Sequence, residues 1–159
     1  MGIAANQLSQ HIIRPTLLYL DRYCPSAEAL LLGAAASQSG LGSALYDCHG
    51  NGLYRISKQR HQLCWDQYLA RDPELASRVR GLASQHAFLQ EPDLELTVNL
   101  RYATAIAWAM VEASQVQLPA ASDIAGLAHI WRQVFQPRGR LRDFTQAWQS
   151  WIGAVGQAA

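Results

Sequence analysis

Residues 26–40 read SAEALLLGAAASQSG and predict a buried helix. Apolar side chains such as Leu31 and Ala34 recur at the spacing that places them on one helical stripe. Gln38 continues this stripe, since it follows Ala34 by four positions and Leu31 by seven. Gly40 is typical of the residue that ends a helix. A polar side chain on an inward-facing stripe needs hydrogen-bond partners or lines a cavity, so Gln38 is the first candidate for a functional residue.

The rest of the chain is predicted to be mainly helical. Ser26 and Ser57 are expected to be the N-caps of two helices. Asp72, which precedes a proline, marks the start of the helix expected at 73–88. Ser122 or Asp123 begins the helix expected at 123–136. Helices are expected at residues 7–14, 15–23, 26–40, 57–69, 73–88, 93–113, 123–136 and 142–155.

Two segments refine the predicted fold class. Residues 105–111 are apolar on every side, so the helix over 93–113 is expected to be the central buried one. Glycines at 50 and 52 flank an asparagine, and this turn cluster predicts a loop with a small β-hairpin between residues 43 and 56. The predicted fold is therefore mainly α, with a small β-hairpin after the helix that carries Gln38.

Length and composition indicate one domain over residues 1–159. Half of the residues are apolar and 16% are charged, so a core is expected and disorder is not. A net charge of +1 argues against a nucleic-acid-binding protein. The basic run RGRLR at 138–142 is interpreted as a solvated loop between helices, with contact to anionic polymers as the alternative. No apolar run is long enough to predict membrane insertion.

The three cysteines, Cys24, Cys48 and Cys64, lack the spacing of a metal site or of a disulfide framework. Reduced thiols are therefore expected. Cys48 is next to His49, which would allow a metal-binding or nucleophilic role, but no second cluster of such residues lies nearby in the sequence. We predict neither a metal nor a cofactor.

Residues 30–42, LLLGAAASQSGLG, resemble the catalytic helix of lysozyme-like peptidoglycan glycosidases. The resemblance is to phage and prophage proteins related to soluble lytic transglycosylases. In that family the helix ends in a Glu-Ser pair whose Glu is the general acid. The aligned pair in this chain is Gln38 and Ser39. The resemblance thus implies a lysozyme-like fold in which the position of the acid is kept and the acid itself is missing.

Further segments resemble the same family in the same order. The segment GLYRI has Arg55 where the family usually has Gln, and His61 alone remains of a Thr-His pair that follows. Similar segments are GLYRI at 52–56, WDQYL at 65–69, DPELA at 72–76, NLRYATAIA at 99–107 and the stretch from Leu118 to Trp131. Together the matches cover most of positions 11 to 148.

The change at Gln38 alters the chemistry. Cleavage of a glycosidic bond needs a proton for the leaving oxygen, which a carboxylic acid with a raised pKa supplies. An amide has no such proton, and loss of a general acid typically lowers the rate by about 10²- to 10⁴-fold. Two explanations are open: a natural loss of activity, or a deliberate change from Glu to Gln that traps substrate. An unrelated helical protein with a capping or core glutamine is the alternative to the resemblance.

Four more residues are candidates for substrate binding, each with a structural alternative. Ser39 could bind a sugar or the carbonyl groups at the helix end. Tyr54 could contact a sugar or lie in the core. Arg55 could anchor a carboxylate or an acetamido group, or it could be a solvated strand residue. Tyr102 occupies the place of a family tyrosine that faces the acid, or it is a buried tyrosine with another partner.

Phe135 and Gln136 stand where lytic transglycosylases have a Tyr-Asn pair beside the substrate. Phe135 lacks the hydroxyl group and Gln136 has a longer amide, which favours natural loss of activity over one engineered change. Phe135 also forms a helical stripe with Trp131, a pattern more typical of a core. Asp47 is a candidate second carboxylate, but it would still need an acid, and a local turn hydrogen bond is the alternative.

Two hypotheses of function follow. The first is a muramidase or lytic transglycosylase that acts on peptidoglycan glycan strands and is inactive with Gln38. The second is a naturally non-catalytic lysozyme-like module that binds glycan or a phage or secretion-machine protein. The N-terminus lacks the pattern of a signal peptide, so synthesis in the cytoplasm is expected. The protein would then reach the cell wall by release, by delivery, or as part of a virion.

Overall fold

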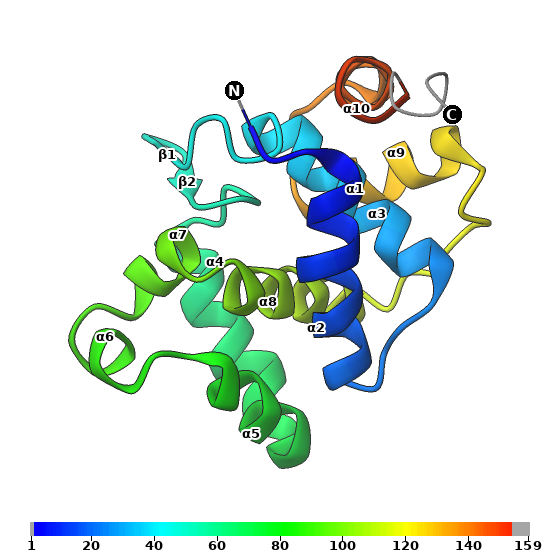
Figure 1. The fold of residues 1–159 in the computed structure, drawn as a ribbon. Coiled ribbons are helices and arrows are strands. Elements are labelled where there is room, and N and C mark those ends of the chain that lie inside the picture. The colour runs from blue at the N-terminus through cyan, green and yellow to red at the C-terminus, as the bar shows by residue number, and fades with distance from the viewer. Residues whose placement is uncertain (1, 154–159) are drawn as a thin grey trace.

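The structure, a computed structural model that describes residues 2–153, is mainly helical with one small sheet (Figure 1). The strands β1 (Tyr46–Asp47) and β2 (Gly50–Asn51) pair antiparallel, with Tyr46 opposite Asn51. The predicted mainly α fold with a small hairpin is confirmed. The helices are α1 (Ala5–Leu8), α2 (Arg14–Tyr19), α3 (Pro25–Ser39), α4 (Lys58–Leu63), α5 (Pro73–Leu82), α6 (Gln85–Gln90), α7 (Glu95–Val98), α8 (Leu100–Ala113), α9 (Ile124–Val134) and α10 (Leu141–Trp148).

Short turns of other helix types lengthen several of these helices. The π-helical turn Ser9–Ile13 joins α1 to α2, and the turns Cys64–Tyr68 (π) and Leu69–Arg71 (3-10) extend α4. A 3-10 turn at Pro92–Leu94 precedes α7, and the π turn Gln149–Gly153 extends α10. The end of the last predicted helix, at 154 and 155, lies outside the described residues.

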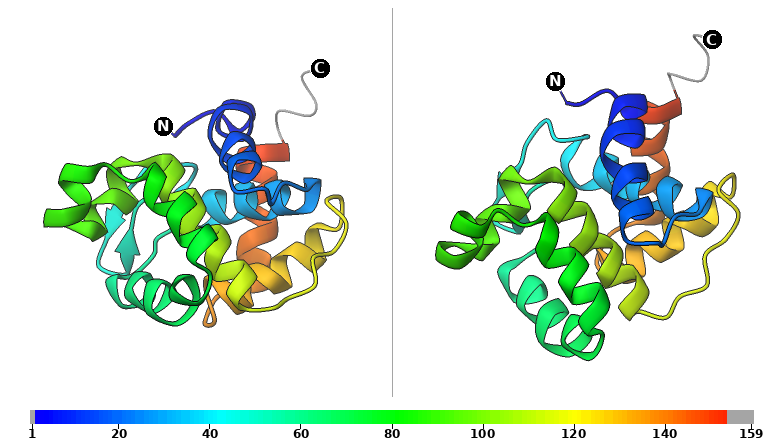
Figure 2. Two further views of the ribbon diagram at one scale, coloured as in Figure 1. Left: turned by 90° about the horizontal axis from the view of Figure 1, so that it is seen from below. Right: turned by 60° about the horizontal axis from the view of Figure 1, so that its bottom comes forward.

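Helix α8 is the buried centre of the molecule, as the sequence predicts. Its residues from Tyr102 to Ala109 are all buried, and it contacts α2, α3, α5 and α7 (Figure 1, Figure 2). The prediction of one helix over 93–113 is wrong in its first part, because Asn99 leaves the helical conformation with φ −116° and ψ 96°. The Asn99 side chain instead caps α8 by accepting a hydrogen bond from the Tyr102 N–H at 3.0 Å.

A buried carboxylate explains this break and a second one. Glu95 is fully buried, and its Oε2 accepts hydrogen bonds from Asn99 Nδ2 at 2.8 Å and from the Ser84 N–H at 3.2 Å. The predicted helix over 73–88 is therefore also wrong, because the chain leaves the helix at Ala83, with ψ 146°, and restarts at α6. The carboxylate of Glu95 thus binds residues at both ends of the segment 84–99.

Helix α3 matches its predicted span but has a different cap. Cys24, not Ser26, is the N-cap, and its Sγ accepts a hydrogen bond from the Ala27 N–H at 3.4 Å. The cap moves because Pro25 takes the first helical position, where its missing N–H needs no partner. Gly40 ends the helix in the left-handed conformation, with φ 57°, as predicted.

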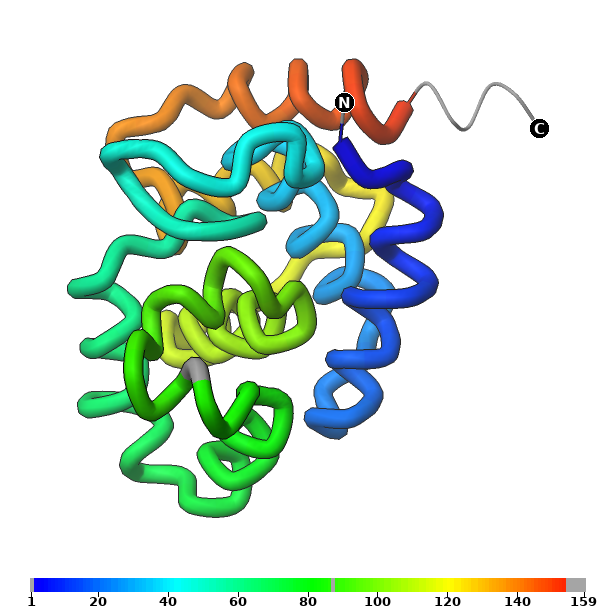
Figure 3. Tube along the Cα trace, turned by 60° about the vertical axis from the view of Figure 1, so that its left-hand side comes forward, coloured from blue at the N-terminus to red at the C-terminus, as the bar shows by residue number. Residues whose placement is uncertain are grey.

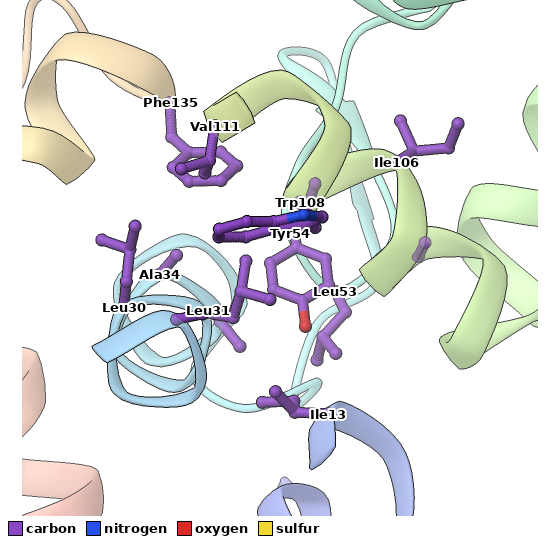
Figure 4. Packing of buried hydrophobic residues seen from close by; sticks show 14 of the residues in the cluster. Ile13, Leu30, Leu31, Ala34, Leu53, Tyr54, Ile106, Trp108, Val111 and Phe135 are labelled. Carbon is purple, nitrogen blue, oxygen red and sulfur yellow. The ribbon is translucent and has the colours of Figure 1, made fainter. Parts of the chain in front are cut away.

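The core of the molecule is one cluster of buried apolar side chains. Leu30 and Leu31 of α3 face Trp108 of α8, Tyr54 and Phe135 in this cluster (Figure 4). Helix α10 packs along α3 and α9, and Figure 3 shows it lying across one end of the molecule. This packing needs a glycine in mid-helix, since a Cβ at residue 33 would lie 2.3 Å from Cζ of Phe144.

The ion pair between Glu28 and Arg14 is expected to make stability depend on pH. Arg14 Nε donates to Glu28 Oε2 at 2.9 Å, and Ser9 Oγ donates to the same carboxylate. Burial raises the pKa of Glu28, but the hydrogen bonds from Arg14 and Ser9 and the charge of Arg14 outweigh burial, so the pKa is lowered overall.

Because the folded-state pKa lies below the unfolded value, this stabilisation is present above the ordinary glutamate pKa of about 4.3 and disappears as the pH falls through the folded value. Glu28→Gln should lower the free energy of unfolding by about 1 kcal/mol at pH 7, and the difference from wild type should vanish in strong acid. Urea unfolding of both proteins across the pH range measures it. A difference that does not change with pH would contradict the ionic explanation.

Candidate functional site

Gln38 lies in the last turn of α3 and lines a cleft of about 740 Å³. The hairpin and the turn that follows it, residues 46–55, form one wall of the cleft, and we call this stretch the hairpin segment. The segment that joins α9 to α10 forms the other wall, and Figure 3 shows the two segments side by side. Five candidate residues from the sequence line this cleft: Gln38, Asp47, Arg55, Phe135 and Gln136. A second space, of about 620 Å³ between the α4 region and α8, contains none of the predicted site residues.

The Gln38 side chain is half-buried and reaches from α3 toward the hairpin segment. Its Nε2 donates a long hydrogen bond, 3.4 Å, to the main-chain carbonyl of Tyr54. The prediction that this side chain needs a partner or lines a cavity is confirmed on both counts. The amide is therefore placed where it can also contact a molecule in the cleft.

Arg55 ties the hairpin segment to the end of α3. Its Nε donates to the carbonyl of Gln38 at 3.1 Å, and its Nη2 donates to the carbonyl of Ala44 at 2.7 Å. Carbonyl groups in the last turn of a helix lack helical partners, so this guanidinium satisfies one of them. The side chain is 11% exposed, and the residue lies in a turn with φ 53°, so Arg55 is neither solvated nor in a strand.

Asp47 makes the predicted turn hydrogen bonds. Its Oδ1 accepts from the N–H groups of His49, at 2.8 Å, and Gly50, at 3.1 Å, and its Oδ2 lies 2.9 Å from Nη1 of Arg55. Burial raises its pKa, but these hydrogen bonds and the charge of Arg55 outweigh burial and lower the pKa overall. Asp47 is therefore ionised at neutral pH and holds no proton for a leaving group.

Ser39 and Tyr54 are buried and have structural partners. Ser39 Oγ lies 2.7 Å from the carbonyl oxygen of Leu53 and accepts a hydrogen bond from the Gly42 N–H at 3.0 Å. The Tyr54 hydroxyl is 2.9 Å from Oγ1 of Thr104, and burial raises its pKa. Both residues thus follow their structural alternatives, Ser39 at the helix end and Tyr54 in the core (Figure 4).

Tyr102 belongs to a buried polar network rather than to the cleft lining. Its hydroxyl lies 2.7 Å from Nε2 of His61 and accepts a hydrogen bond from Nε1 of Trp65 at 2.9 Å. Nδ1 of His61 in turn lies 2.8 Å from Oδ1 of Asp93. The structural alternative, a buried tyrosine with partners other than a ligand, describes Tyr102.

Phe135 and Gln136 lie at the end of α9, on the wall opposite the hairpin. Phe135 is 3% exposed and stacks on Tyr54 with ring centroids 6.4 Å apart, so its packing is mainly in the core. Gln136 is half-buried and lines the cleft. The carbonyl of Phe135 accepts a hydrogen bond from Nη1 of Arg60 at 2.9 Å, which ties α4 to this wall.

Several cleft residues were not predicted as site residues from the sequence. They include His49 and Arg60, together with Arg138 and Arg140 of the run interpreted as a solvated loop. The basic run and the adjacent pair of Cys48 and His49 were the local signals, whereas Arg60 reaches the cleft through the tertiary fold. Arg138 and Arg140 are exposed, as a solvated loop requires, and they also line the cleft.

Comparisons with known protein families, with curated proteins and with solved structures gave no match. Within residues 2–153, no helix is both long and apolar enough to cross a lipid bilayer. In the same part of the chain, His, Cys, Asp and Glu side chains do not gather in a group of three that could hold a metal ion.

Proposed function

We propose that this protein binds the glycan strand of peptidoglycan in the cleft at Gln38, as a lysozyme-like protein of the muramidase or lytic transglycosylase type that lacks the general acid. The observation that carries this proposal is the position of Gln38. It ends a buried helix, borders a cleft beside a small hairpin, and occupies the place of the acid in the family that the sequence resembles.

The cleft has the chemistry to hold sugars without cutting them. Amide groups of Gln38 and Gln136 and the hydroxyl of Ser57 line it, and such groups form hydrogen bonds with hydroxyl and acetamido groups. At the position of the general acid, Gln38 has no titratable proton, and Asp47 is ionised, so neither side chain can protonate the leaving oxygen. The protein is thus expected to bind glycan and release no product.

A second candidate is a non-catalytic structural module of a phage or secretion assembly, whose cleft takes a protein segment. The departures at Phe135 and Gln136 favour it, because a cleft that no longer cleaves is free to change its lining. We also propose that the protein reaches the cell wall by lysis or in a virion. Absence of glycan binding would favour this second candidate.

Co-sedimentation with purified, insoluble peptidoglycan tests the proposal. Wild-type protein should be retained, and Gln136→Trp should bind at least about tenfold more weakly, equivalent to 1.4 kcal/mol, because the indole fills the cleft. Gln133→Trp is the matched control, since Gln133 is exposed on α9 and does not line the cleft. Failure of wild type to sediment, or equal retention of both tryptophan variants, would contradict the proposal.

A further inference from the structure

The cleft around Gln38 carries more positive than negative charge. Arg55, Arg60, Arg138 and Arg140 line it, whereas its acidic lining is limited to two aspartates. The whole chain is nearly balanced, with 13 basic and 12 acidic residues. The excess of arginine is therefore a local property of this cleft.

The two aspartates do not neutralise this excess. Asp47 is paired with Arg55 at 2.9 Å, so these two charges cancel each other. Asp143 accepts a hydrogen bond from the main-chain N–H of Arg140 at 3.1 Å. Among residues 2–153, no acidic side chain lies within 4.0 Å of the guanidinium nitrogens of Arg60, Arg138 or Arg140.

Of the three arginines without an acidic partner, Arg60 is the most buried. It is half-buried, and burial lowers the pKa of its guanidinium. One of its N–H groups donates to the carbonyl of Phe135, a neutral acceptor. A desolvated cation with no counter-charge gains more from an anionic ligand than an exposed cation does.

The space on the other side of the hairpin has different charges. Its volume is about 790 Å³, and it adjoins the first cleft at Asp47, His49 and Ser57, which line both. Glu91, Asp93 and Lys58 line this space, and Nζ of Lys58 lies 3.8 Å from Oδ2 of Asp93. This space therefore lacks the excess of positive charge found in the cleft around Gln38, so an anion on a ligand that spans both spaces would be attracted to the cleft around Gln38.

We propose that Arg60, Arg138 and Arg140 form a subsite for an anionic substituent of the bound glycan strand. This inference rests on the proposed glycan binding and adds which part of the ligand lies on the α9–α10 side. The required chemistry is an oxyanion, and guanidinium groups bind carboxylate and phosphate oxygens in the same geometry. The two sources are a carboxylate of the peptide stem and a phosphate of a polymer attached to the strand.

Titration with soluble peptidoglycan fragments tests this subsite. The probes are a disaccharide–peptide with free carboxylates, the same fragment with its carboxylates amidated, and a fragment that carries a phosphate polymer and amidated carboxylates. Arg138→Gln/Arg140→Gln should bind the preferred anionic probe about tenfold more weakly than wild type at low salt, and 0.5 M salt should remove most of the difference. Arg101→Gln/Arg132→Gln removes the same charge from exposed positions outside the cleft and should bind as wild type does.

The outcomes separate this inference from the proposed function. A carboxylate ligand is indicated if only the first probe depends on the arginines, and a phosphate ligand if only the third does. Equal binding of all three probes by wild type and by the cleft variant would overturn the subsite and leave glycan binding intact. No binding of any probe by wild type would overturn both.

Discussion

Gln38→Glu is expected to produce glycan cleavage about 10²- to 10⁴-fold faster than wild type. The substitution keeps the shape of the side chain and adds a proton that can be transferred to the leaving oxygen. Loss of turbidity of purified cell walls, together with analysis of the released sugars, measures the activity and identifies the product. Gln85→Glu, an exposed change on α6 away from the cleft, should stay as inactive as wild type.

The restored activity should be greatest in acid. The introduced carboxyl would lie beside the carbonyl of Tyr54, which accepts a hydrogen bond from Gln38 and could accept one only from a protonated carboxyl. This contact raises the pKa of the carboxyl, while the arginines of the cleft lower it. We expect the pKa to be raised overall, because the carbonyl contact is a direct hydrogen bond. Activity should fall as the pH rises through that pKa. A Gln38→Glu protein that unfolds like wild type and cleaves nothing at any pH would contradict an enzyme that lacks only its acid, and would favour the naturally non-catalytic module.

Gly52→Ala is expected to lower the free energy of unfolding by at least about 3 kcal/mol. Gly52 has φ 78°, and a Cβ there would lie 1.7 Å from the main-chain oxygen of Leu96. The oxygen belongs to the backbone of α7 and cannot rotate away, so the hairpin segment and α7 must separate. Urea unfolding of purified protein measures the change.

Gly42→Ala is the matched control for this effect. Gly42 also has a positive φ, 84°, but a Cβ there would meet its nearest neighbour, Cδ1 of Leu53, at 3.5 Å, which is ordinary contact. This variant should lose only about 1–2 kcal/mol, the cost of left-handed backbone for a residue with a Cβ. Equal losses in the two variants would mean that backbone conformation, not the contact with Leu96, dominates at Gly52.

The sequence predicts the parts of the fold that depend on neighbouring residues. Ser57, Asp72 and Asp123 cap their helices as expected, each accepting a hydrogen bond from an N–H three residues later. Asn99 caps α8 in the same way, but it lies inside a helical apolar pattern, so the break there was missed. The break near Ala83 was missed because it involves a hydrogen bond from the Ser84 N–H to the buried carboxylate of Glu95, eleven positions later.

The candidate site shows the same division. Gln38 is predicted from the stripe of its own helix, because the end of a buried stripe is visible in local sequence. Tyr102 could not be placed in this way, since its partners His61 and Trp65 come from another part of the chain. Arg60 was missed for the same reason, as its contact is with Phe135, 75 positions away.

The contact that Arg55 makes with the end of α3 does not depend on which side chain stands at position 38. Arg55 binds the main-chain oxygen of Gln38, a group that every amino acid has. Glutamine and glutamate codons can differ by one base, and the two side chains have nearly the same shape. A single point mutation can therefore place a carboxylic acid at position 38 while the contact between Arg55 and the end of α3 stays the same.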